Sequence, residues 1–302
     1  MNIVETNKPT LARSLPGPFA IRTCEVHSGK AIWRLQFRQP IAAGVAESII
    51  SIHTELKNFD GAAHVCLPRV DDAQTIIYPA VLSPNLLFDV LFSFNARDLI
   101  DELTVAFKCL GDFLSAVHVR SNPNLPEYDL LPVPRWYAHR SSVRDELIKV
   151  RASLPLHHAP RLRTWAAEKA LPSPVTRRLI HGRFSTAAIA WEAGNPKEFA
   201  VLDWLEVSRG DPLIDIARGL SEIIEAVAAG FLTIGDGQKL ARVLTVAAAP
   251  EVNATQLRKL VAQHIIDHMS LRGWVTGHPE NLSPFLVSVE ATLGELVMEA
   301  AL

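Results

Sequence analysis

The first third of the chain contains short runs in which apolar and polar residues alternate, a pattern typical of β-strands. Residues 20–26 and 30–37 form two such runs, separated by a polar, glycine-containing turn. Two more strands are expected over residues 65–70 and 75–81, around a turn at Asp71-Asp72. These runs predict a small antiparallel sheet near the N-terminus.

Helical periodicity dominates the rest of the chain. Apolar residues at helical spacing predict a helix over residues 43–59 and further helices over residues 98–119, 141–153, 161–170, 213–229, 236–247, 254–272 and 286–301. Short strands are expected over residues 176–180 and 199–202, and the proline-rich residues 121–137 predict a loop. Strands grouped first and helices later predict an α+β protein, with a β-rich part over residues 1–79 and a helical part over residues 80–302.

Composition excludes several classes of protein. The chain has 302 residues, of which 48% are hydrophobic, and its formal charge of −2 gives no reason to expect nucleic-acid binding. Cys24, Cys66 and Cys109 lie far apart and predict neither a disulfide framework nor a zinc site. Without a signal-type apolar core or an apolar stretch of about 18 residues, the expectation is a cytoplasmic protein with no membrane segment.

Residues 179–217, LIHGRFSTAAIAWEAGNPKEFAVLDWLEVSRGDPLIDIA, are the part of the chain most informative about chemistry. Their His181-Gly182, Leu202-Asp203-Trp204, Gly210-Asp211-Pro212 and Asp215 resemble the catalytic core of the aminoglycoside phosphotransferase and choline-kinase-like family. The resemblance implies a bilobal protein-kinase-like fold with a small β-rich N-lobe and a large, mainly helical C-lobe. It also implies ATP-dependent phosphoryl transfer, in which a carboxylate orients the substrate and acid and amide groups hold magnesium.

Two positions depart from that pattern. Arg183 stands where the family has its catalytic aspartate, and Ala188 stands where it has a metal-ligating asparagine. Arginine cannot accept a proton, and losing a general base costs roughly 100- to 10,000-fold in rate. The resemblance therefore implies a degenerate site, in which Asp203 is the one metal ligand left or else an acid paired with Arg183.

Other motif residues are expected to be structural. Asp211 can cap the helix that follows it, with Pro212 at the first helical position. The resemblance implies that His181, Asp211 and Asp215 brace the catalytic loop. His264 and His268 share a helix face, as zinc ligands do, but no third ligand is apparent, and a plain helix face is the favoured interpretation.

The N-terminal part contains a weaker version of the family pattern. The resemblance places Arg34 as a phosphate-pairing cation, Glu47 as its helical partner and Tyr78 in the hinge, so these are the candidate nucleotide-binding residues. A surface ion pair between Arg34 and Glu47 is an equally open alternative. The expected phosphate loop has one glycine, Gly17, between two prolines, which lack the N–H donors that cradle phosphates.

Three functions remain open. The sequence favours a catalytically impaired, pseudokinase-like protein that acts as a binding or scaffolding partner and uses neither ATP nor magnesium. The alternative is a divergent active ATP-dependent phosphotransferase for small molecules, with Asp203 as its sole metal ligand. Third, scattered arginines around the motif, among them Arg177, Arg178 and Arg183, are compatible with a cleft for a small anionic ligand or a protein partner.

Overall fold

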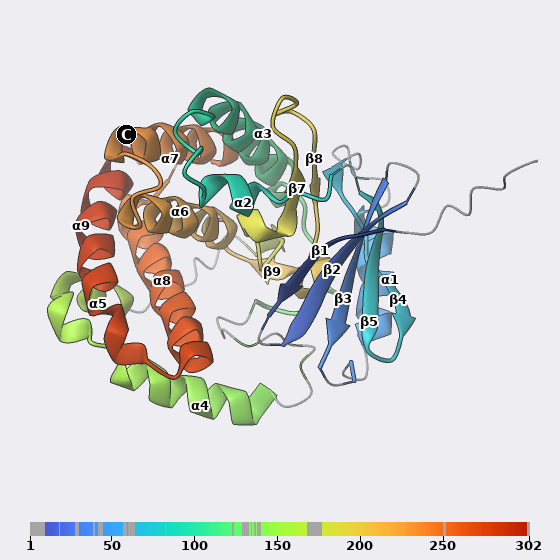
Figure 1. Ribbon diagram of the computed structural model, residues 1–302, viewed down its shortest axis with the longest axis horizontal. Coiled ribbons are helices and arrows are strands. Elements are labelled where there is room, and N and C mark those ends of the chain that lie inside the picture. The colour runs from blue at the N-terminus through green and yellow to red at the C-terminus, as the bar shows by residue number, and fades with distance from the viewer. Residues whose placement is uncertain are drawn as a thin grey trace, which may run out of the picture.

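The chain forms a β-sheet packed against a larger group of helices (Figure 1). The computed structural model describes residues 10–17, 19–27, 30–38, 40–41, 45–56, 59, 64–81, 83–122, 124–128, 133, 135, 137, 140–167, 177–249 and 252–300. This arrangement confirms the predicted α+β, bilobal architecture. The two parts are called the N-lobe and the C-lobe below.

The N-lobe sheet is antiparallel, in the strand order β1-β2-β3-β5-β4. Its strands are β1 (Thr10–Pro16), β2 (Ala20–His27), β3 (Lys30–Phe37), β4 (Arg69–Asp72) and β5 (Thr75–Val81). The sequence pattern did not predict β1, and it placed Asp71 and Asp72 in a turn, whereas they end β4 and the turn lies at residues 73–74. Of the strand expected over residues 65–70, Val65 forms only an isolated bridge with Val201.

One face of the sheet is buried against the C-lobe. In the strand register, Arg22 lies opposite Leu35, Cys24 opposite Trp33, and Trp33 opposite Tyr78. Opposed residues share a face, so all of these side chains point the same way. Trp33 and Tyr78 are fully buried there, which makes this face the contact surface with the rest of the molecule.

Helix α1 (Val45–Leu56) links the sheet to the C-lobe. Its Ile49 packs in the core that contains Trp33, and its Ile52 and Leu56 pack in the core of the C-lobe. After β5, the short helix α2 (Leu87–Leu91) begins the C-lobe.

The C-lobe is built mainly of long helices. They are α3 (Ile100–His118), α4 (Arg140–Ser153), α5 (Pro160–Ala167), α6 (Leu213–Ala228), α7 (Ile234–Ala248), α8 (Ala254–Thr276) and α9 (Ser283–Ala300). Helices α3 and α7 approach closely at Gly111, where an added Cβ atom would lie 2.6 Å from the Leu244 carbonyl oxygen. The ends of the C-lobe helices agree with the sequence-based predictions to within a few residues. The reason is that apolar residues recur at helical spacing along each helix and are buried.

Two small antiparallel ribbons lie between the helices and the sheet (Figure 1). One pairs β6 (Arg178–Ile180) with β9 (Ser208–Gly210), and the other pairs β7 (Ile189–Trp191) with β8 (Phe199–Val201). Two 3₁₀ turns flank the second ribbon: η3 (Thr186–Ala188) comes directly before β7, and η4 (Trp204–Glu206) comes shortly after β8. The ribbons therefore bring His181 and Asp203 to one place.

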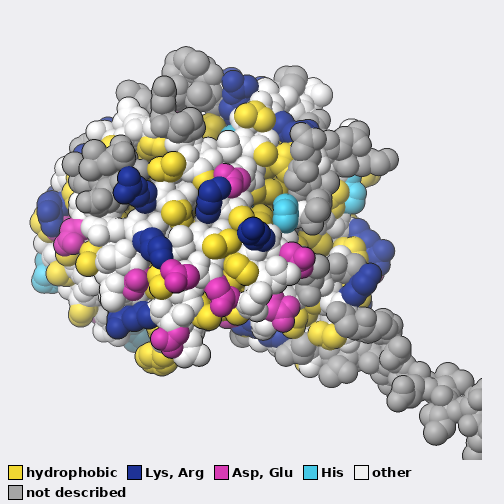
Figure 2. Space-filling model, turned by 90° about the horizontal axis from the view of Figure 1, so that it is seen from above, with side chains coloured by type: hydrophobic (Ala, Val, Ile, Leu, Met, Phe, Trp, Pro, Cys, Tyr) yellow, Lys and Arg dark blue, Asp and Glu magenta, His cyan; other side chains and the backbone are white. Residues whose placement is uncertain are grey.

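The surface above α3 and α7 mixes charges of both signs. Lys and Arg side chains are interspersed with Asp and Glu on this face (Figure 2). In the part of the chain that the structure describes, no helix has both the length and the apolar character needed to span a bilayer.

Candidate functional site

His181 and Asp215 hold the loop that follows β6. The Asp215 carboxylate accepts hydrogen bonds from the backbone N–H groups of His181 (2.7 Å) and Gly182 (2.9 Å). The His181 ring donates from Nε2 to the Leu202 carbonyl (2.8 Å) and accepts at Nδ1 from the Arg183 N–H. Gly182 has φ 77°, and a Cβ atom there would lie 2.3 Å from the Glu206 carbonyl oxygen. The loop thus requires a glycine at this position.

Asp215 is fully buried and also accepts a hydrogen bond from His118 Nε2 at 3.1 Å. Burial alone would raise the pKa of Asp215, but the bonds from His118 and the backbone outweigh it and lower that pKa overall. Nearby, Asp211 accepts from the Leu213 N–H (2.9 Å) at the start of α6. Both acids therefore contact the backbone around the motif.

Asp203 lies two residues after the end of β8 and has an unusual backbone conformation. Its φ of 63° makes it the sole non-glycine residue with positive φ among the described residues. Its carboxylate is mostly buried, and one oxygen, Oδ1, has no hydrogen-bond partner. Left-handed backbone at a non-glycine residue costs on the order of 1–3 kcal/mol and is found preferentially at binding and catalytic sites.

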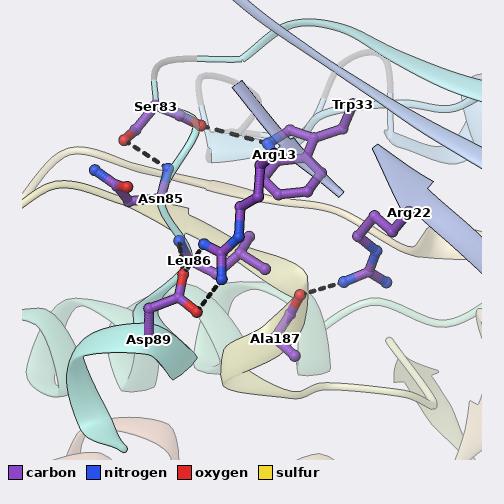
Figure 3. Close-up of polar contacts among 8 residues, drawn as sticks. All are labelled: Arg13, Arg22, Trp33, Ser83, Asn85, Leu86, Asp89 and Ala187. Atoms are coloured by element: carbon purple, nitrogen blue, oxygen red, sulfur yellow. Dashed lines mark hydrogen bonds and ion pairs between the residues drawn. The ribbon is translucent and has the colours of Figure 1, made fainter. Parts of the chain in front are cut away.

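Arg22 on β2 reaches from the sheet to this loop. Its Nη1 donates to the Ala187 carbonyl at 2.5 Å (Figure 3). Its Nη2 lies 3.5 Å from Asp203 Oδ2. The expected pairing of Asp203 with Arg183 is therefore wrong, because Asp203 is paired with Arg22. Among the described residues, no carboxylate lies within ion-pair distance of the Arg183 guanidinium, which lines the cleft.

The predicted phosphate-pairing cation lies on the other side of the sheet. Arg34 alternates with Trp33 and Leu35 along β3, so its side chain points away from the C-lobe. It pairs instead with Glu25 (3.4 Å) and Asp71 (3.0 Å). The prediction that Arg34 faces the cleft is therefore wrong, and the sheet cation that reaches Asp203 is Arg22.

The other two candidates from the N-lobe differ in position. Glu47 lies in α1, and its side chain is outside the described residues. Tyr78 lies on the buried face of β5, where burial and then the nearby Asp203 carboxylate hold its pKa well above the usual value. Tyr78 therefore borders Asp203 as part of the packed core.

The contact between the lobes is filled by apolar side chains. Trp33, Tyr78, Leu86, Ala190 and Leu202 belong to one buried cluster. The Trp33 indole donates to the Ser83 carbonyl (3.4 Å), and Arg13 on β1 forms an ion pair with Asp89 on α2 (Figure 3). With Arg22, Arg13 gives the sheet two ionic links to the C-lobe.

A cleft of about 250 Å³ opens beside Asp203 and extends over α6 and α8. Its polar lining consists of Arg22, Tyr128, Arg183, Ser185, Asp203, Glu206, Arg218, Ser221, Glu222, His264, Asp267 and His268. The sequence singled out Arg183, Asp203, His264 and His268. Most of the other lining residues were missed, because they come from strand, loop and helix positions that look like ordinary polar surface.

Each acid that lines the cleft has its own partner. Glu206 accepts from the backbone and side chain of Arg135 (2.8 and 3.0 Å), and Asp267 pairs with Arg151. Glu222 accepts from Ser185 Oγ and from the Thr186 N–H, and burial raises its pKa. Burial likewise raises the pKa of Asp267 to about 6.

The two cleft histidines differ in charge. His268 pairs with Glu225 at 2.8 Å, and that carboxylate raises the pKa of His268 to about 9. His264 is buried, and burial lowers its pKa well below the usual value, so it is neutral at pH 7. These two residues do not share a ligand position, and the described residues contain no group of three or more potential metal-binding side chains.

The residues around Asp203 do not fit a magnesium ion. Magnesium requires near-octahedral oxygen ligands. Here Ala188 offers a methyl group, and the free Oδ1 of Asp203 is one oxygen beside the Arg22 guanidinium. The Arg22 guanidinium, 3.5 Å from Asp203 Oδ2, is a fixed positive charge that repels a divalent cation at this position.

Comparisons with known proteins agree with this fold. Residues 16–254 match the model of the phosphotransferase enzyme family. The chain is similar to viomycin phosphotransferase from Streptomyces vinaceus, with 26% identity over 240 residues that cover 72% of this chain and 79% of that protein.

Solved structures with a similar fold include two antibiotic phosphotransferases. The spectinomycin phosphotransferase APH(9)-Ia, in complex with ADP and spectinomycin, has a TM-score of 0.57 and 13% identity, covering 95% of this chain and 93% of that one. The aminoglycoside phosphotransferase APH(3'')-Id from Streptomyces rimosus has a TM-score of 0.56 and 15% identity, covering 84% and 92%. These likenesses show the kinase-like fold, and the family match shows that the chain belongs to the phosphotransferase enzyme family.

Proposed function

We propose that this chain is a non-catalytic member of the family, which binds a ligand in its cleft without transferring a phosphoryl group. The observation that supports this most strongly is the position of Arg22. Its guanidinium bonds to the Ala187 carbonyl and pairs with Asp203, the one remaining acid of the expected metal site.

Three losses support the proposal together. Arg183 cannot act as the proton acceptor for a substrate hydroxyl. Ala188 and the Arg22–Asp203 pair leave no set of oxygens for magnesium. Buried Trp33 and Tyr78 lie where the two lobes meet. Apolar side chains therefore fill the space between the N-lobe sheet and the C-lobe.

A phosphoryl-transfer assay tests this proposal. The purified protein is incubated with γ-labelled ATP, magnesium and a mixture of viomycin and aminoglycosides, with and without substitution of Asp203 by asparagine. The proposal predicts no labelled product and no hydrolysis above the level of the Asp203→Asn variant. ATP-dependent turnover that disappears in that variant would overturn it.

A divergent active phosphotransferase is the second candidate. Two observations favour it: the buried, unpartnered Oδ1 of Asp203 and the left-handed backbone at the same residue. The name of the relative viomycin phosphotransferase makes a small antibiotic the acceptor to try first. In that case Arg22 would have to move away from Asp203 before a metal could bind.

A further inference from the structure

We infer that the cleft is a metal-free binding site for a small organic anion, a carboxylate or phosphate ester with a neighbouring hydroxyl or amine. Arg183 and Arg218 would bind its oxyanion, and His264 would accept the neighbouring hydrogen bond. This inference deepens the proposed non-catalytic function. It rests on that function because a cleft that bound MgATP would not be free for another anion.

Two guanidinium groups that line the cleft, those of Arg183 and Arg218, are available to bind an anion. Its acids already have partners, since Arg22 pairs with Asp203, Arg135 with Glu206 and Arg151 with Asp267. Among the described residues, neither Arg183 nor Arg218 has a carboxylate within ion-pair distance. Guanidinium groups favour carboxylate and phosphate because their planar fork can donate two parallel hydrogen bonds.

Arg218 is held in place for such a role. Its Nη2 bonds to the Tyr128 hydroxyl at 3.0 Å, while its Nε is buried and has no partner. A buried donor without a partner is costly, so an incoming oxyanion that satisfies it gains that energy. The acids that act electrostatically on Arg218 are Asp215 and Asp267, and both of these acids have other hydrogen-bond donors.

His264 adds a second and different unpaired group. Its side chain is 6% exposed and lines the same cleft from α8. One ring nitrogen bonds to the backbone of Ile214, whereas Nε2 has no hydrogen-bond partner. Because Arg218 lies close enough to disfavour a charged ring, His264 is a neutral acceptor beside a cation. A neutral acceptor beside a guanidinium group suits a ligand that carries a hydroxyl or amine next to an oxyanion.

The test uses the full-length protein in EDTA, without ATP. Chemical-shift titrations follow two probes that share this chemistry: glycerol 3-phosphate and glycerate. Saturable binding of either one supports the inference, and the tighter of the two identifies phosphate or carboxylate as the source. Absence of saturation by both probes at about 50 mM would overturn it.

Variants locate the binding. Arg183→Met and Arg218→Met each remove one charged donor, and each should weaken the better probe by about tenfold or more. The matched control is Arg178→Met, because Arg178 is exposed on β6 and does not line the cleft. His264→Phe should weaken glycerol 3-phosphate more than ethyl phosphate, which lacks the hydroxyl.

Two outcomes contradict the inference even if a probe binds. One is a loss in Arg178→Met equal to that in Arg183→Met, which would indicate a nonspecific charge effect. The other is binding unaffected by Arg183→Met, a variant at a half-buried position that is expected to fold. The titrations contain neither ATP nor metal, so a failure of both probes to bind would overturn this inference alone. The proposed non-catalytic function is tested separately by the phosphoryl-transfer assay.

Discussion

The Arg22 guanidinium lies 3.5 Å from Asp203 Oδ2, across 181 residues of sequence. This pair joins the N-lobe sheet to the loop after β8 and places a fixed positive charge where the family resemblance implies a metal. The site thus differs from the family pattern in its electrostatics as well as in the side chains at Arg183 and Ala188.

Replacing Arg22 should therefore affect stability as well as ligand binding. Arg22→Met keeps much of the side-chain volume but leaves the largely buried Asp203 carboxylate unpaired, and the free energy of unfolding should fall by about 1–3 kcal/mol. Arg34→Met is the matched control, because Arg34 pairs on the outer face and should cost about 0–1 kcal/mol. Urea unfolding measures both, and equal losses would contradict the assigned roles.

Asp215 should be the most sensitive acid of the motif. Asp215→Asn replaces a buried carboxylate that accepts from two backbone N–H groups and His118, and the expected loss in unfolding free energy is about 3–5 kcal/mol. Asp211→Asn should be nearly neutral, since asparagine is an equally good residue at a helix start. Comparable denaturation midpoints for the two variants would argue against a bracing role for Asp215.

Gly182 and Gly277 separate steric clash from backbone strain. Both have positive φ, but a Cβ atom meets the Glu206 carbonyl oxygen at Gly182 and has no neighbour within 4 Å at Gly277. Gly277→Ala should cost about 1–2 kcal/mol for the left-handed backbone alone. Gly182→Ala should cost clearly more, as thermal unfolding can show, and the reverse order would contradict the geometry of the loop.

His268 should make stability depend on pH in the alkaline range. Its pKa is about 9 in the folded protein against an ordinary value of 6.5, because the Glu225 carboxylate stabilises its charged form. The stability from this pair is fully present below pH 6.5 and is lost as pH rises through 9. His268→Gln should flatten the dependence of unfolding free energy between pH 6.5 and 9, whereas an unchanged slope would show that the pair is not ionised.

Much of the C-lobe could be predicted from the sequence because its determinants are local. Each long helix repeats an apolar stripe, and the motif spacing from His181 to Asp215 is set by short ribbons that are close in sequence. The sheet was harder. β1, with the sequence TLARSLP, has little alternation of its own, and its strand conformation depends on pairing with β2.

The site was predicted less well because its key contacts are long-range. The family resemblance predicted that Arg34 pairs with phosphate. The apolar residues Trp33 and Leu35 on either side of it, however, indicate that Arg34 faces outward. The same alternation places Arg22 with Cys24 on the buried face. Its distance from Asp203 and Ala187, however, depends on how the two lobes pack, which no local pattern specifies.

The most direct test of the central claim is a calorimetric titration of the purified protein with ATP, with and without magnesium. Wild-type protein and Asp203→Asn are compared under identical conditions. The non-catalytic account predicts no magnesium-dependent binding for either protein at millimolar ATP. Micromolar, magnesium-dependent binding by the wild type that Asp203→Asn abolishes would contradict it and establish a working nucleotide site.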